Sequence, residues 1–183
     1  MSSVIIAGNT SGTITLDAPN VAGTTTLTLP TTSGTIVTTN TMPTGSVLQV
    51  VNATYSTQTS TTSSTYTDTG LSASITPSSA SNKILVITNN NGNYIASGSV
   101  DAAIRFRLLR GATSIAVLDD IVAYLDATTS HSGASVSTCY LDSPSTTSST
   151  TYKTQFHSRN NVSNCFVNYG SSVSTITLME IKA

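Results

Sequence analysis

The side chains best suited to chemistry in this 183-residue sequence include three aspartates. Asp119 and Asp120 are adjacent, and Asp126 follows closely. Paired carboxylates can perform acid–base chemistry on a glycosidic bond. Adjacent residues of a strand point to opposite faces, however, which places these two poorly as a catalytic pair. We interpret them as a polar turn between two apolar strands, and the loop spacing of an EF-hand calcium site is absent.

Histidine and cysteine are the other residues that could bind metal or perform catalysis. His131 and His157 both stand in polar stretches, and we expect both on the surface. Serine is too abundant to identify a catalytic triad, and the sequence has no G-x-S-x-G elbow or lysine-bearing phosphate loop. Cys139 and Cys165 fit no zinc spacing, and we expect two small buried side chains, with a disulfide between them left open.

Basic side chains gather at one place in the sequence. Arg105, Arg107 and Arg110 are three of the seven basic residues. Strand alternation in "IRFRL" places Arg105 and Arg107 on one face. This face is a docking or carbohydrate-binding patch, or a solvated strand face, or it forms ion pairs across a subunit interface with Asp101 or Asp119.

Aromatic side chains are few, with seven tyrosines, three phenylalanines and no tryptophan. Sugar-binding sites often use stacked aromatic rings, so a lectin-like site lacks its best marker. We expect Tyr94, Tyr124 and Tyr140 near exposed loops or strand ends. Together with Arg105 and Arg107 they are the candidate surface-binding residues. We predict no catalytic, metal-binding or cofactor-binding residues.

Composition excludes several classes of partner. Only 8% of the residues are charged and the formal net charge is −1, so the clustered positive charge of a nucleic-acid-binding protein is missing. No apolar run approaches membrane-spanning length. The start of the chain, "MSSVIIAGNTSG", has no basic region and only a short apolar core, so we expect no secretory export.

The alternation of apolar residues with threonine predicts an all-β protein. Hydrophobic residues make up 38% of the chain, and turn-forming residues interrupt their runs about every ten positions. Threonine is β-branched and fits a pleated surface. The Pro- and Gly-containing junction "TMPTGS" divides the chain into a repeat at residues 1–44 and a head at residues 45–183.

The first region repeats every eleven residues, with glycine at positions 12, 23 and 34. Each unit reads as a strand with one apolar face and one threonine face. Three short strands cannot bury a core alone, so the repeat implies partner chains, either in a compact trimeric stack or along an extended arm. The apolar residues that would anchor it are Ile14, Leu16, Leu27, Leu29 and Ile36.

The second region reads as about nine strands. We expect them at residues 45–55, 64–77, 82–91, 101–111, 113–125 (one strand or two), 133–144, 150–159, 164–170 and 173–183. No segment carries a helical stripe. This number of antiparallel strands in about 140 residues suits a two-sheet β-sandwich, with a jelly roll as the first choice.

The sequence resembles a family of virion proteins at four places. "GNTSGTITLDAP" with "AGTTTLTLPTTSGTIV" resembles the N-terminal repeat of many predicted tail-fibre and virion structural proteins of bacteriophages, especially cyanophages. "DTGLSASITPSSASNKILV", "YLDSPSTTSSTTYK" and the ending "STITLMEIKA" resemble the C-terminal module that often follows it. The resemblance implies a non-enzymatic virion protein and a homotrimeric jelly roll similar to the tumour-necrosis-factor/C1q type. It brings no catalytic residues or cofactors.

These observations favour one function and leave an alternative. We expect a capsid decoration (cement) or head-fibre protein on the virion surface, assembled in the host cytoplasm. Its N-terminal repeat would attach to the major capsid protein or another virion protein, and its head would project as a knob. The alternative is a short tail fibre or receptor-binding protein that recognises host-surface glycan. An enzyme, such as a glycan depolymerase, is the third and least favoured class.

Overall fold

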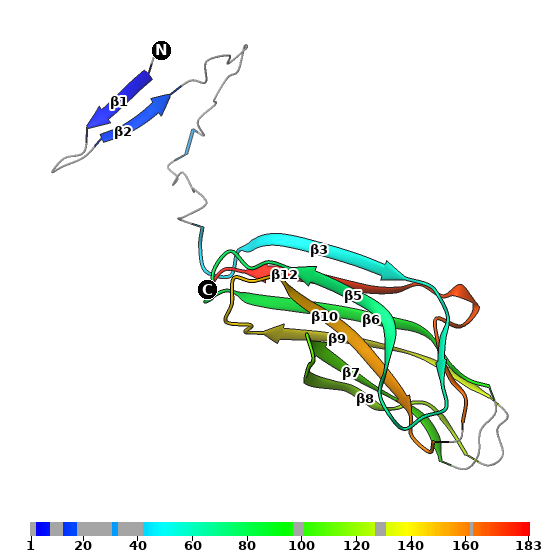
Figure 1. Cartoon of the computed structure of the whole chain (residues 1–183). Coiled ribbons are helices and arrows are strands. Elements are labelled where there is room, and N and C mark those ends of the chain that lie inside the picture. Colours follow the sequence, from blue (N-terminus) through cyan, green and yellow to red (C-terminus); the bar gives the residue numbers. More distant parts are fainter. Residues whose placement is uncertain are drawn as a thin grey trace. The chain divides into compact units, whose positions relative to one another are not determined.

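The computed structural model describes residues 3–7, 13–17, 31–32, 42–96, 101–126, 131–161 and 163–183 (Figure 1). The chain divides into two compact units, residues 1–38 and 39–183. We call them the N-terminal unit and the head, and describe each by itself. The sequence places the boundary a few residues later, between positions 44 and 45.

The described part of the head is built from strands and one short 3-10 helix. The strands are β3 (Val47–Tyr55), β4 (Thr59–Thr61), β5 (Thr67–Ile75), β6 (Lys83–Ile95), β7 (Ala102–Arg110), β8 (Thr113–Leu125), β9 (Ser132–Asp142), β10 (Thr150–Ser158), β11 (Cys165–Val167) and β12 (Ser174–Ile181), and the helix is η1 (Tyr169–Ser171). Each predicted strand is present, and residues 113–125 form one strand. The short β4 was not predicted.

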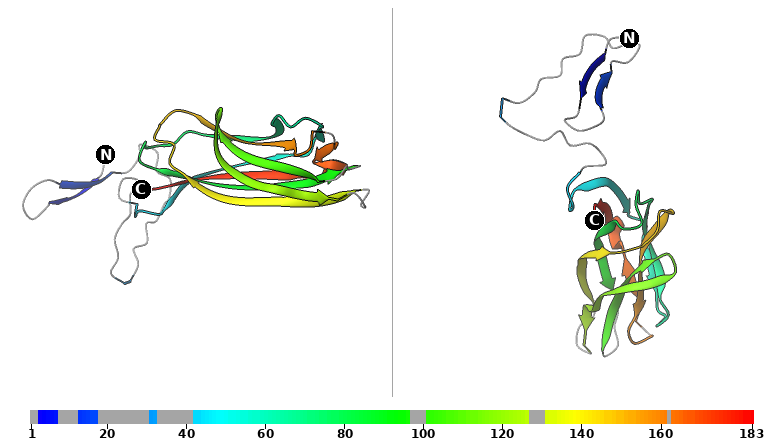
Figure 2. Two further views of the ribbon diagram at one scale, coloured as in Figure 1. Left: turned by 90° about the horizontal axis from the view of Figure 1, so that it is seen from below. Right: turned by 90° about the vertical axis from the view of Figure 1, so that its left-hand side faces the viewer.

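These strands form two antiparallel sheets that pack as a sandwich (Figure 2). One sheet has the order β5-β10-β7-β8. The other has the order β3-β12-β6-β9 along its length, with β11 and β4 beside the far end of β6. Numbering only the eight long strands in chain order gives 1-8-3-6 and 2-7-4-5, the arrangement of an eight-stranded jelly roll. The predicted fold class is confirmed.

Strand alternation decides which side chains face the interior. In β7, Ile104, Phe106 and Leu108 are fully buried, whereas Arg105 and Arg107 between them are half-buried on the outer face. The predicted alternation in "IRFRL" is therefore confirmed. A strand of a sheet that covers a core on one side alternates in this way because successive side chains point to opposite faces.

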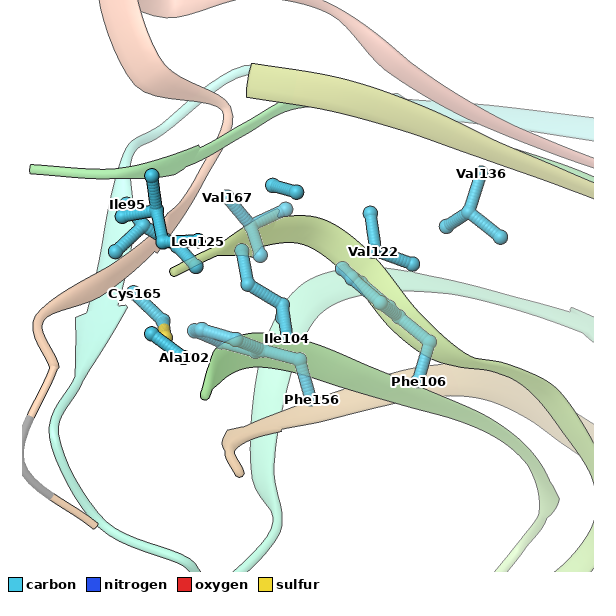
Figure 3. Packing of buried hydrophobic residues seen from close by; sticks show 11 residues of the cluster. Ile95, Ala102, Ile104, Phe106, Val122, Leu125, Val136, Phe156, Cys165 and Val167 are labelled. Atoms are coloured by element: carbon cyan, nitrogen blue, oxygen red, sulfur yellow. The ribbon is translucent and has the colours of Figure 1, made fainter. Parts of the chain in front are cut away.

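Two apolar clusters fill the interior of the head. Figure 3 shows the first, which contains Ile104, Phe106 and Phe156 and includes the buried Cys165. The rings of Phe106 and Phe156 are stacked with centroids 6.0 Å apart. The second cluster surrounds the fully buried Tyr152. Burial of such side chains is the main favourable term in folding.

A layer of buried polar residues separates the two clusters along the strands. In β10, Thr154 lies between Tyr152 of one cluster and Phe156 of the other. The Thr154 hydroxyl donates to Asn90 Oδ1 at 2.9 Å and lies 2.7 Å from the hydroxyl of Thr69. Each of these three side chains is fully buried. Hydrogen bonding within the layer offsets the cost of removing these groups from water.

The described part of the N-terminal unit is a β-hairpin. It consists of β1 (Ser3–Ala7) and β2 (Thr13–Asp17), which pair antiparallel with Ile5 opposite Thr15. The strand β2 corresponds to the first unit of the eleven-residue repeat. Ile5 and Ile6 are 62% and 53% exposed, so this two-stranded element leaves apolar side chains uncovered.

Candidate functional site

The outer face of the six-stranded sheet carries a continuous row of apolar side chains. Val50 pairs with Met179, Met179 with Leu85, and Leu85 with Leu141, so four adjacent strands contribute one residue each. Directly opposite residues on one face of a sheet lie in contact range. Val50 is 56% and Leu141 50% exposed. These four residues, with the exposed Ile87 on β6, form what we call the apolar face.

Two further rows continue this surface toward the other end of the sheet. In the first row Ile87 pairs with Cys139, whose thiol is free and exposed, while β12 and β3 contribute the polar Thr177 and Asn52. The next row consists of polar residues, Thr54, Thr175, Asn89 and Ser137. The hydroxyl of Ser137 donates to Asn89 Oδ1 at 3.0 Å. We call these four residues the polar row, and it marks where the apolar face ends.

A second exposed apolar surface lies on β8, which is an edge strand of the four-stranded sheet. Val117 is 66%, Ile121 53% and Tyr124 48% exposed. The pairing of β8 with β7 shifts register repeatedly. Such irregularities bend an edge strand and discourage uncontrolled pairing with other chains. The edge therefore presents side chains in place of a regular hydrogen-bonding ladder.

The outer face of the four-stranded sheet is polar. Arg107 donates to Gln155 Oε1 from Nε at 2.9 Å and from Nη2 at 2.6 Å. Its guanidinium carbon lies 3.9 Å from the centre of the Tyr66 ring, a cation–π contact. Arg105 forms an ion pair with Asp120, with Nε and Oδ1 3.0 Å apart. Both predicted surface-binding arginines are thus held by neighbours in the same chain.

Asp68 completes this polar face. It accepts hydrogen bonds from Lys153 Nζ at 2.8 Å and from Gln155 Nε2 at 2.6 Å. Partial burial opposes ionisation of Asp68, but the hydrogen bonds from Lys153 and Gln155 and the nearby positive charges outweigh it and lower its pKa. Gln155 therefore links the Asp68 and Arg107 groups into one network, which suits a face exposed to water.

The acidic pair singled out from the sequence has a different role from the predicted polar turn. Asp119 and Asp120 lie within β8, so the turn prediction is wrong. Asp119 Oδ1 accepts a hydrogen bond from the backbone of Ile121 at 2.9 Å, and Asp120 pairs with Arg105. Within the chain, Asp101 pairs with Arg159 at 3.2 Å, and the ion pairs expected across a subunit interface stay a prediction.

Two expectations about burial are corrected. His157 is only 6% exposed: its Nδ1 lies 2.9 Å from the carbonyl oxygen of Ser158, and the Tyr66 ring packs edge-on against it at 4.4 Å. His131 is exposed, as predicted. Cys165 is buried as predicted, and burial raises the pKa of its thiol, but Cys139 is exposed and both thiols are free. His157 pairs with Arg105 on the outer face of the sheet, and the Tyr66 ring from a separate segment covers it there, which is why the sequence misleads.

An aromatic cluster lies at the far end of the outer face of the six-stranded sheet. The rings of Tyr94 and Tyr169 stack with centroids 4.4 Å apart and an interplanar angle of 24°. Phe166 meets Tyr169 edge-on at 5.6 Å and lies 6.2 Å from Tyr94, and the His131 ring lies 6.1 Å from Tyr94. We call these four residues the aromatic platform. Of its members, the sequence singled out only Tyr94 for binding.

The backbone that carries Tyr169 is tightly held. Asn168, with φ 56°, precedes it in the left-handed region and is fully buried. Its side chain donates to the Thr57 carbonyl at 3.1 Å and accepts a 2.5 Å hydrogen bond from the Ser174 hydroxyl. A Cβ added at Gly92 would lie 2.7 Å from the Tyr169 nitrogen, so this approach requires glycine. The signal available in the sequence was "NYG", where Asn and Gly favour such backbone conformations.

The other two predicted tyrosines lie elsewhere. Tyr124 is on the β8 edge. Tyr140 is half-buried and packs against the second core cluster. In the described part of the chain, neither takes part in a ring contact of the aromatic platform.

Two buried carboxylates stabilise the opposite end of the head. Glu180 is fully buried and accepts four hydrogen bonds, from Gln49, Asn82 and the backbone and hydroxyl of Ser78. Burial opposes its ionisation, but these hydrogen bonds outweigh it and lower the pKa of Glu180. We assign this group a structural role, because both of its oxygens accept hydrogen bonds from within the fold.

Asp142 is the second buried carboxylate. It accepts from Arg110 Nη1 at 2.9 Å and from the Tyr152 hydroxyl at 2.6 Å. Burial, followed by the hydrogen bond to Asp142, raises the pKa of Tyr152. Arg110, the third arginine of the cluster in the sequence, therefore forms an ion pair with a buried carboxylate of the same fold.

The predicted anchor residues belong to the N-terminal unit. Ile14 and Leu16 lie in β2, opposite Ile6 and Val4. The remaining three, Leu27, Leu29 and Ile36, lie outside the described residues.

Among the described residues, no group of three or more histidine, cysteine, aspartate or glutamate side chains could hold a metal ion. The same residues include no helix that is long and apolar enough to cross a membrane. No protein-family model matches the chain, and no curated protein matches it.

Proposed function

We propose that this chain is a non-enzymatic structural protein of a bacteriophage virion, a homotrimeric capsid decoration or head-fibre protein. The observation that carries the proposal is the apolar face, which has no covering partner within the described part of the chain. Monomeric proteins rarely leave a contiguous apolar surface of this kind in water, and such surfaces mark interaction sites. The resemblance of the repeat and head to virion proteins supports the choice of assembly.

The two apolar surfaces of the head support a ring of copies. An association with more than two subunits in a closed ring uses two different patches, one from each neighbour. The apolar face is one patch, and the β8 edge with Val117 and Ile121 is the other. The β8 edge of one copy packs on the apolar face of the next. The charged side chains of Arg107, Asp68 and Lys153 lie on the outer face of the four-stranded sheet, where this arrangement leaves them in water.

The N-terminal unit supports attachment to another protein. A two-stranded hairpin is at best marginally stable alone in water. Ile5 and Ile6 remain exposed on β1, and both strands offer unpaired backbone groups that can add to a neighbouring sheet. We therefore assign the repeat to attachment on the particle and the head to the projecting part.

The exposed Cys139 provides a test of the assembly. We expect the full chain to sediment at three times its 18.8 kDa mass, with Cys139 protected from iodoacetamide because it lies beside Ile87. Leu141→Glu places a charge in the apolar face at a position that tolerates exposure, and should yield monomers with a reactive Cys139. The matched control is Ser72→Glu on the outer face of the four-stranded sheet, which should remain trimeric. A folded monomer of the wild-type chain with a freely reactive Cys139 refutes the trimer.

The virion assignment needs a separate measurement. Immunogold labelling of intact particles with antibody to residues 46–183 should place gold over the capsid, and deletion of residues 1–44 should abolish attachment. Gold confined to the tail would instead favour the alternative, a receptor-binding short tail fibre. Unlabelled particles from a host that expresses the protein would contradict both.

A further inference from the structure

We propose that the aromatic platform binds the pyranose ring of a neutral saccharide. The proposal does not depend on the assembly suggested above. The aromatic rings of the platform are partly exposed to solvent, although the same head contains two apolar clusters in which aromatic rings are buried. Tyr169 is 45% exposed, and Tyr94 and Phe166 are half-buried beneath it.

The geometry of the rings offers a flat surface with a defined orientation. Tyr94 covers one side of Tyr169 at 4.4 Å, so a ligand that stacks on Tyr169 must use the other side of its ring. The face of an aromatic ring carries partial negative charge. The C–H bonds on the less polar side of a pyranose carry partial positive charge, so a sugar ring stacks on such a face. The tyrosine hydroxyls at the ring edges can exchange hydrogen bonds with sugar hydroxyls.

The charge of the surroundings favours a neutral ligand. The platform is built from the far half of β6, from β11 and η1, and from the start of β9. The corresponding segments, residues 89–96, 131–141 and 163–175, contain no aspartate, glutamate, lysine or arginine, and His131 is the one histidine among them. An acidic glycan or a phosphorylated ligand would find no lysine or arginine there to offset its loss of water. Serine and asparagine side chains dominate these segments, and they suit hydroxyl groups.

Gly133 lies beside Tyr94 at one flank of the platform. It pairs with Tyr94 across β9 and β6, and a Cβ added at Gly133 would lie 3.9 Å from Tyr94 Cδ2. A larger side chain at this position would extend over the Tyr94 ring. On the opposite flank, Phe166 pairs with Tyr94 and Ser60. The row Ser60–Phe166–Tyr94–Gly133 thus has small residues at both ends and aromatic rings in the middle.

The platform is rigid before any ligand arrives. The buried side chain of Asn168 is hydrogen-bonded to both Thr57 and Ser174, and the backbone at Gly92 packs directly against Tyr169. A preformed site loses less conformational freedom when it binds. Hydrophobic packing of Tyr169 alone would not require the left-handed backbone of Asn168 or the close approach of Gly92.

The position of the platform suits contact with an external ligand. The backbone of Gly45 donates to Lys182 at 2.8 Å, so the head joins the preceding residues at the end where β3 begins and β12 ends (Figure 1). The platform is at the other end of the six-stranded sheet. The polar row lies between it and the apolar face, which separates the saccharide site from the surface assigned to self-association.

The test uses the full chain on a panel of immobilised neutral saccharides, with oligomers of glucose, galactose, mannose and N-acetylglucosamine, and with sialylated and sulphated oligosaccharides as acidic comparisons. We expect saturable binding to at least one neutral member. Tyr169→Ala should weaken that binding at least tenfold, and Tyr169→Phe, which keeps the ring, should retain most of it. Gly133→Val should also weaken binding, because it covers the platform without removing a ring.

The control is Ser72→Glu on the outer face of the four-stranded sheet, away from the platform and from both surfaces assigned to self-association, and it should bind like wild type. Sedimentation of each variant separates ligand binding from assembly. Three results overturn the proposal: no binding to any neutral saccharide, unchanged binding by Tyr169→Ala, or dissociation of the oligomer by Tyr169→Ala. The last would assign the rings to the contact between copies.

Discussion

Replacing Glu180 with glutamine should destabilise the head although the two side chains have nearly the same shape. Glu180 Oε1 accepts hydrogen bonds from Ser78 N, Ser78 Oγ and Asn82 Nδ2, and Oε2 accepts from Gln49 Nε2 at 2.6 Å. In Glu180→Gln one acceptor becomes an amide nitrogen, which then faces the donor of Gln49. Gln49 cannot turn its amide without loss, because its Nε2 also donates to the Thr76 carbonyl at 2.7 Å.

The expected cost follows from these four bonds. Hydrogen bonds to a charged group contribute about 1 kcal/mol more than neutral ones, so the three retained bonds lose about 3 kcal/mol together. The lost bond to Gln49 adds about 1 kcal/mol or more. Against this, the neutral amide avoids part of the cost of burying a carboxylate. We expect Glu180→Gln to lower the free energy of unfolding by about 3 kcal/mol at pH 7.

The effect should depend on pH with a definite sign. The hydrogen bonds lower the pKa of Glu180 in the folded head, whereas an unfolded glutamate titrates near about 4.3. A lowered folded pKa contributes stability above the unfolded pKa, and this contribution is lost as the pH falls through the folded value. The difference between wild type and Glu180→Gln should therefore be complete at pH 7 and narrow below about pH 4.

Urea unfolding at one fixed protein concentration, followed by circular dichroism at pH 7 and at low pH, measures both quantities. The control is Asp120→Asn, which removes a carboxylate whose side chain is 58% exposed and should change stability by less than about 1 kcal/mol. Equal urea midpoints for wild type and Glu180→Gln at pH 7 would refute the reasoning. So would a difference that persists unchanged in acid.

The remaining predictions concern the fold of the head. Tyr152→Phe removes the 2.6 Å hydrogen bond to Asp142 and should cost about 1–3 kcal/mol in urea unfolding, since it leaves a buried carboxylate with one partner fewer. Gly70 has φ +92°, and a Cβ there would lie 2.2 Å from the Tyr55 ring, so Gly70→Ala should cost more than about 2 kcal/mol. Gly111→Ala is its control, because Gly111 also has positive φ but has open space around it; equal costs for the two would rule out the steric contribution.

The alternation of side chains was sufficient to predict most of the head. Strict period-two patterns such as Ile104, Phe106 and Leu108 define both a strand and its buried face. The turn-forming residues between the patterns define where strands end, and enough short antiparallel strands in one domain leave few architectures other than a sandwich. Strands, their buried faces and the turns between them could be predicted because each depends on residues that are close together in the sequence.

The surfaces could not be predicted because they depend on pairing between distant strands. Val50 and Leu141 join one apolar row only after β3, β12, β6 and β9 are placed in order. Phe166 and Tyr169 come 72 and 75 residues after Tyr94, and no pattern in the sequence links positions so far apart. His157 was misplaced for a similar reason, since the Tyr66 ring that covers it lies on a separate segment.

The place of β12 in its sheet has a consequence for synthesis. This strand lies between β3 and β6 and pairs with both, although it is the last of the three to leave the ribosome. Until residues 174–181 have emerged, β3 lacks its pairing partner in the sheet. The core beside β6 also lacks Ile176 and Leu178, the buried side chains of β12. Pairing across such sequence separations is slow, so nascent heads should depend on protection from aggregation and complete their folding only after translation has passed Ile181.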